Sequence, residues 1–250
     1  MKSSIIVLIF TAFAVTGSAF AQNNPTPDEA AELFKKALIF RQEGKSGEAI
    51  ETFKKYISIK PGNASAYNNL GALYSDSGRY SEAISNFTEA LSLQPESPEI
   101  RRNLGAAFYH LGRIQEAVTE FRQAIRLKPD YVLAYNDLGI ALSDLHEDRE
   151  AIAVLERGIR INPQNANSFH NLGYALYYAK HLKKASGAFE QALLLDPNLG
   201  ESRLYLASVY LMEGNRKAAI EQYSKLKLHN LELADKLYKV LFSDKVLLIK

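Results

Sequence analysis

The sequence predicts an all-α protein, a right-handed α-solenoid of antiparallel helix pairs closed by a C-terminal capping helix. Three observations lead to this fold class: prolines recur every 34 residues, a small residue stands at the same place after each, and apolar residues follow helical spacing between them. The prolines are Pro61, Pro95, Pro129, Pro163 and Pro197. Aligned on them, the chain divides into six units, 30–63, 64–97, 98–131, 132–165, 166–199 and 200–229.

The N-terminal stretch 1–21 has the pattern of a cleaved export signal. Lys2 supplies a positive charge, Ile5 to Val15 form an apolar core, and Ala19 and Ala21 are the small residues that a signal peptidase reads. The apolar core is about 11 residues long, short of the roughly 18 that span a bilayer. We expect cleavage near Ala21 and a periplasmic or secreted product without a membrane span.

A short linker and N-terminal cap are expected at 22–29. Thr26, Pro27, Asp28 and Glu29 read as a capping box, with Thr26 as the N-cap and Glu29 reaching back to it. The chain contains no cysteine, so no disulfide stabilises the exported product and packing alone must do so.

The unit 64–97 shows the pattern that predicts two helices. The first helix is predicted from residues at i, i+3, i+4 and i+7, which share one face: Tyr67, Leu70, Gly71 and Tyr74. Gly78 follows where a left-handed residue ends a helix. The second helix presents a buried face and stops at the proline: Ala83, Phe87 and Ala90.

The eighth residue of every unit is small, and this predicts a close crossing of the two helices. Its members are Ala37, Gly71, Gly105, Gly139, Gly173 and Ala207. Alanine at the twentieth place faces the same gap, and a large aromatic or leucine at the twenty-fourth fills the space beside it.

These residues resemble the tetratricopeptide-repeat family, whose motif places Leu-Gly, Tyr, Ala, Phe or Tyr, Ala and Pro at the same offsets. The resemblance covers residues 30–228 and implies a protein that holds other proteins. His146 and Lys180 replace the helix-ending glycine, Gly158 and Leu226 replace a small alanine, and Leu231 stands in place of the sixth proline. The sixth unit is the weakest match.

The segment 230–250 is predicted to be a capping helix and an apolar tail. Asn230 is its expected N-cap, and one apolar face is formed by Leu233, Leu237, Val240 and Leu241. The sequence assigns no role to the tail from Val246 to Lys250.

The resemblance implies that the first helices line a concave groove, where repeat positions 2, 5, 6, 9, 12 and 13 face a ligand. A row of polar side chains there is suited to the backbone of an extended peptide: Asn68, Asn69, Arg102, Asn103, Asn136, Asp137, His170 and Asn171. A structural role of this row stays open, because asparagine is also the commonest residue of the family motif at the sixth place.

Tyrosines gather in the second half of the same groove, and they are candidate anchors for a partner segment: Tyr109, Tyr174, Tyr177, Tyr178 and Tyr205. Because core positions are already filled by Phe108, Leu172, Leu176 and Tyr210, we expect these tyrosines to be unnecessary for packing. Scattered surface tyrosines without a function are the alternative.

No catalytic, metal or cofactor site is predicted. His110 and His170 lie two units apart without carboxylates at ligand spacing. Lys and Arg number 30 against 28 Asp and Glu, and without a basic stripe a nucleic-acid partner is not expected. The sequence favours a non-catalytic scaffold or adaptor that binds partner proteins or peptides, in cell-envelope assembly or a secreted complex. The alternatives are a homo-oligomerising structural component of an envelope assembly and a regulatory subunit of an enzyme.

Overall fold

The computed structural model describes residues 27–242, so the expected export signal 1–21, the N-cap Thr26 and the tail from Val246 to Lys250 lie outside it. Within this range the chain forms thirteen helices and no strand. The helices are α1 (Pro27–Gln42), α2 (Ser46–Ile59), α3 (Ala64–Asp76), α4 (Tyr80–Leu93), α5 (Pro98–His110), α6 (Ile114–Leu127), α7 (Val132–Asp144), α8 (Asp148–Ile161), α9 (Ala166–Tyr178), α10 (Leu182–Leu195), α11 (Gly200–Met212), α12 (Arg216–His229) and α13 (Leu231–Phe242). The predicted all-α solenoid is confirmed.

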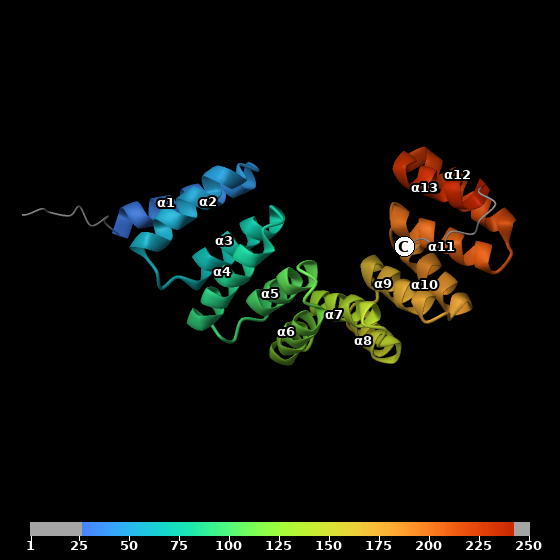
Figure 1. The fold of residues 1–250 in the computed structure, drawn as a ribbon, viewed down its shortest axis with the longest axis horizontal. Coiled ribbons are helices and arrows are strands. Elements are labelled where there is room, and N and C mark those ends of the chain that lie inside the picture. Colours follow the sequence, from blue (N-terminus) through green and yellow to red (C-terminus); the bar gives the residue numbers. More distant parts are fainter. Residues whose placement is uncertain (1–26, 243–250) are drawn as a thin grey trace, which may run out of the picture.

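The helix pairs stack into an arc (Figure 1). The first helices of the central units, α3, α5, α7 and α9, lie on its inner side, and the second helices lie outside them. Each helix packs mainly on the helices next to it in sequence. The first helices also contact one another along the arc, from α3 with α5 to α9 with α11. We call the side formed by the first helices the concave face.

The two helices of each unit approach closely at the small eighth residue, as the sequence predicts. A Cβ atom placed on Gly105 would lie 2.7 Å from the ring of Phe121 and 3.2 Å from the carbonyl oxygen of Ala117. The alanine at the twentieth place is fully buried in all six units: Ala49, Ala83, Ala117, Ala151, Ala185 and Ala219. In the second to fifth units the crossing therefore leaves no room for a side chain from the first helix at this point, and in the first and sixth units it holds only the methyl groups of Ala37 and Ala207.

The turn between the two helices needs a left-handed residue. Gly78 adopts φ +72° there, as predicted. His146 and Lys180 occupy the same place in the fourth and fifth units with φ +60° and +63°. Because this region costs an ordinary residue roughly 1–2 kcal/mol, the surrounding packing must hold the turn against its own preference.

The C-terminal helix α13 covers the last unit and packs on α11 and α12. The predicted N-cap is confirmed, since Asn230 Oδ1 accepts a hydrogen bond of 3.0 Å from the Leu233 amide. Leu237 and Leu241 are 0% and 1% exposed. In the sixth unit Leu226, 2% exposed, fills the place of the alanine in the family motif, and α11 and α12 form an ordinary pair.

We predict that Gly105→Leu lowers the free energy of unfolding by about 1–3 kcal/mol, because the new side chain overlaps Phe121. Urea denaturation measures the change. Gly187→Ala is the matched control: a Cβ there meets nothing within 4 Å, and the substitution should stabilise α10 by about 0.5–1 kcal/mol. An unmoved midpoint for Gly105→Leu would show that the helices do not cross at this residue.

Candidate functional site

Neighbouring first helices are joined along the concave face by polar contacts between residues 35 apart in sequence. Asn103 Nδ2 donates a hydrogen bond of 3.1 Å to Asn68 Oδ1. Arg102 Nε donates one of 2.6 Å to Asp137 Oδ2. Since each unit is 34 residues long, such a contact joins the fifth place of one unit to the sixth place of the next. Part of the predicted polar row therefore holds the solenoid together.

Burial is the largest influence on both members of the ion pair between Arg102 and Asp137. It raises the pKa of the Asp137 carboxyl, and the nearby guanidinium opposes that shift. For Arg102, burial alone would lower the pKa, but the attraction of Asp137 outweighs it and the pKa is raised. The guanidinium keeps its charge, and the pair joins α5 to α7.

The remaining amides of the row are also engaged or buried. Asn69 accepts a hydrogen bond of 2.5 Å from Arg41 Nη1 and donates one of 2.8 Å to the Ser65 carbonyl. Asn136 and Asn171 are only 5% and 9% exposed. The expectation that these two amides face a ligand is wrong, because both side chains are buried, and Asn136 lies beside Gly158 of α8.

Four of the five predicted tyrosines gather where α9 meets α11, and the fifth, Tyr109, lies on α5. The rings of Tyr174 and Tyr178 lie 4.6 Å apart between centroids, and Tyr205 lies 5.6 Å from both Tyr174 and Tyr177. Tyr177 is 3% exposed and belongs to the core, so the expectation that it is unnecessary for packing is wrong. Tyr174, Tyr178 and Tyr205 remain partly exposed.

A carboxylate that the sequence analysis did not single out lies beside these tyrosines. Tyr109 donates a hydrogen bond of 2.5 Å to Asp144 Oδ2, and Tyr174 donates one of 3.3 Å to Asp144 Oδ1. Burial, followed by the Asp144 carboxylate, raises the pKa of both tyrosines. Asp144 occupies the thirteenth place of its unit, one of the groove positions, and a search for acidic as well as amide and aromatic residues there would have found it.

His170 lies under the same tyrosines. Its Nδ1 is 2.8 Å from Ser202 Oγ, and its ring centroid is 5.8 Å from that of Phe189 and 6.2 Å from that of Tyr205. Burial lowers the pKa of the imidazole. Its side chain is packed between α9 and α11, so it contributes little surface to a ligand.

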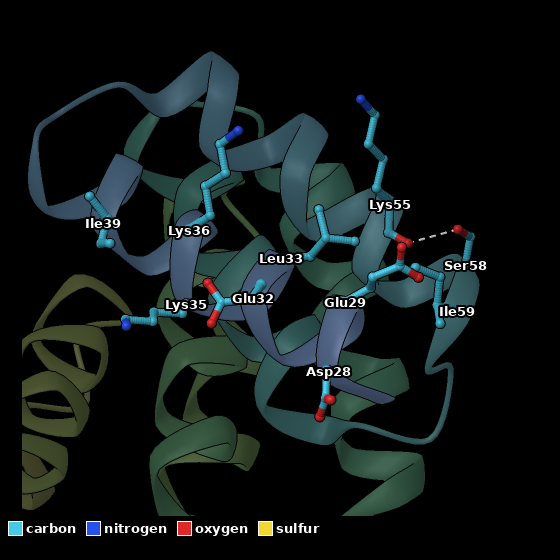
Figure 2. A pocket seen from close by; sticks show the side chains of 10 residues that line it. All are labelled: Asp28, Glu29, Glu32, Leu33, Lys35, Lys36, Ile39, Lys55, Ser58 and Ile59. Carbon is cyan, nitrogen blue, oxygen red and sulfur yellow. Dashed lines mark hydrogen bonds between the residues drawn. The ribbon is translucent and has the colours of Figure 1, made fainter. Parts of the chain in front are cut away.

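A cavity lies elsewhere, at the N-terminal end of the described helices (Figure 2). It has a volume of about 990 Å³ and is lined only by α1 and α2. Leu33, Ile39 and Ile59 form its apolar part, surrounded by lysine and acidic side chains. None of the predicted site residues lines it. The sequence feature that marks this face is Lys36, which stands at the place where the later units carry leucine.

Two further classes of site are absent from the part of the chain that the structure describes. No group of three or more histidine, aspartate or glutamate side chains in residues 27–242 is arranged to hold a metal ion. None of the described helices combines the length and apolar character required to cross a membrane.

Four family models, all described as tetratricopeptide or TPR repeats, match the chain over residues 37–78, 68–132, 111–172 and 166–199. Together they span most of the helix pairs. No curated protein sequence matches the chain.

Solved structures match the fold along most of its length. The structure of PilW, a type IV pilus biogenesis factor, superposes with a TM-score of 0.77 over 86% of this chain and all of its own, at 23% identity, which shows the fold alone. A thermophilic TPR protein of Thermus thermophilus has a TM-score of 0.62 at 26% identity and covers 72% of this chain and 100% of its own. MamA of Desulfovibrio magneticus RS-1 has a TM-score of 0.60 at 26% identity, covering 68% and 96%.

We predict that His170 makes stability depend on pH. Its pKa in the folded protein is lowered from the ordinary value of 6.5, so below about pH 6.5 the unfolded chain takes up a proton that the folded protein resists. The free energy of unfolding should therefore fall as pH drops through this range and level off below the folded pKa. Chemical denaturation at a series of pH values measures it.

The variant His170→Gln should lose this component of the pH dependence, whereas exposed His229→Gln should retain it. Equal pH dependence in His170→Gln and wild type would contradict the assignment.

Proposed function

Because the chain belongs to the tetratricopeptide-repeat family, whose domains bind protein partners, we propose that it is a non-catalytic scaffold that holds an extended segment of a partner protein on its concave face. The observation that carries this proposal is the group of partly exposed tyrosines, Tyr109, Tyr174, Tyr178 and Tyr205, contributed by α5, α9 and α11. Tyrosine offers apolar area with a polar tip and loses little entropy on binding.

The polar contacts between first helices favour the same function. The Asn68–Asn103 and Arg102–Asp137 contacts hold α3, α5 and α7 in fixed positions before any partner arrives. A surface that is already ordered loses less conformational entropy when it binds, so more of the contact energy appears as affinity. This suits a protein that captures flexible segments.

A partner segment would contact the exposed parts of the tyrosine rings and the N–H and C=O groups of Asn103 that make no hydrogen bond within the described residues. An amide has one acceptor oxygen and two N–H donors, and Asn103 uses one donor on Asn68. Its remaining capacity is available to the backbone of an extended segment. The amide would then orient the backbone of the bound segment, and the tyrosines would supply most of the binding energy.

We predict that Tyr178→Ala weakens the binding of peptides selected from a random phage-displayed library on the wild-type protein by roughly tenfold or more. Removing this ring deletes partly exposed anchor area, and because Tyr178 also packs against the core cluster of Tyr177 and Phe189, thermal melting of the variant checks that the fold is retained. Titration of the purified protein with each selected peptide measures the affinity.

The matched control is Tyr238→Ala on α13, whose side chain is 50% exposed away from the first helices of the central units. It should bind the selected peptides as the wild type does. Equal binding by Tyr178→Ala, or selection of no peptide at all, would count against a concave binding surface.

We also propose that the chain is exported and works outside the cytoplasm, in an envelope or secreted complex. The support is the charged start, apolar core and small residues of segment 1–21, which lies outside the described residues. We predict that the protein recovered from an expressing bacterium has lost residues 1–21, as intact-mass measurement would show.

Aspartate at both Ala19 and Ala21 should block this processing, because the peptidase accepts only small side chains at these places. Phe20→Leu, between them, should leave it unchanged. A wild-type mass that includes residues 1–21 would refute export by this route.

A further inference from the structure

The packing of the solenoid does not explain Asp144. It is the last residue of α7, where a negative charge is unfavourable because the carbonyl end of a helix is itself negative. It makes no ion pair in residues 27–242. Its two oxygens instead accept the hydroxyls of Tyr109 and Tyr174, from the helices on either side. A carboxylate in this position needs a reason other than helix or ion-pair stability.

The surface around Asp144 carries uncompensated negative charge. The guanidinium of Arg102, on the preceding first helix α5, is paired with Asp137. Glu201 on α11 has only His170 as an ion-pair partner among the described residues, at 3.9 Å, and burial favours the neutral form of that imidazole. Lys180 lies over the Tyr177 ring at 5.8 Å. The whole chain has a formal charge of +2, so this negative region is local.

Aromatic rings flank the carboxylate. Tyr109 and Tyr174 contact it directly, and the Tyr178 ring is 4.6 Å from that of Tyr174. All three are partly exposed. A carboxylate accepts about four hydrogen bonds and Asp144 uses two, so two acceptor positions remain. The site therefore combines a free acceptor edge with aromatic faces.

We propose that Asp144, Tyr109, Tyr174 and Tyr178 form a subsite for an arginine side chain of the bound segment. A guanidinium is planar, donates two parallel hydrogen bonds to a carboxylate and stacks on aromatic rings, so one side chain satisfies both features of the site. Lysine carries a more strongly hydrated point charge and does not stack in this way. The inference rests on the proposed function, because it names the chemistry of the segment bound there.

The protonation of the two tyrosines is consistent with this role. Burial and the neighbouring carboxylate raise the pKa of Tyr109 and Tyr174, so both hydroxyls keep their protons and continue to orient Asp144 at physiological pH. The carboxylate is thus held in one position before a ligand arrives. Its negative charge remains available to an incoming cation.

The test pans one random phage-displayed peptide library against three purified proteins: wild type, Asp144→Asn and Asp76→Asn. Asparagine keeps the shape of the side chain and one acceptor oxygen for one tyrosine hydroxyl, places an NH2 group beside the other hydroxyl, and removes the charge. Asp76 is the matched control, because it is the last residue of α3, the same place in its unit, and makes no hydrogen bond to a tyrosine in the described residues. Thermal melting of each variant checks that the fold is retained.

Arginine should be enriched among peptides selected by wild type and Asp76→Asn, and the enrichment should vanish with Asp144→Asn. The most enriched peptide should bind wild type about tenfold more weakly when its arginine is replaced by glutamine, and a lysine version should fall between. Asp144→Asn should bind all three versions about equally.

Two results would overturn the subsite. Selected peptides without arginine enrichment, or enrichment that persists in Asp144→Asn, would leave the concave binding surface intact and remove the arginine subsite alone. Failure of the wild-type protein to select any peptide would instead refute the proposed function, and the subsite with it.

Discussion

The close crossing of the two helices in each unit is the constraint on which the rest of the structure depends. At Gly105 the first helix lies so near Phe121 that even a methyl group would overlap the ring. A similarly close crossing recurs in the other units, and the first helices of the central units come together on the concave face. The contacts between units, and the position of every side chain on that face, follow from this spacing.

The positions of the helices and of the turns between them could be predicted from the sequence. Periodic apolar residues, small residues at fixed places and the regular prolines determine each helix locally, and His146 and Lys180 adopt the left-handed turn even without glycine. Contacts between units were harder to predict. Whether Tyr177 is buried depends on Tyr205, in the following unit, and helical periodicity within one unit carries no information about that neighbour.

Two features of the candidate site were missed for related reasons. Asp144 becomes notable only because tyrosines from α5 and α9 reach it, which no pattern within the fourth unit reveals. The cavity at α1 and α2 lies where Lys36 replaces the leucine of the later units, so the shared motif does not predict it. A repeating motif predicts what the units share, whereas the candidate sites arise where units differ.

The contacts between residues 35 apart make the order of the units matter. The third unit pairs differently in its two directions: amide meets amide between the second and third units, and guanidinium meets carboxylate between the third and fourth. Units with the same backbone fold therefore cannot be exchanged for one another, because their polar side chains differ. If the fourth were excised in frame, Arg102 would be brought opposite Asn171 and would lose its carboxylate. A regular 34-residue spacing otherwise permits whole units to be gained or lost during evolution. Between the third and fourth units, the need to keep Arg102 opposite a carboxylate would restrict such changes.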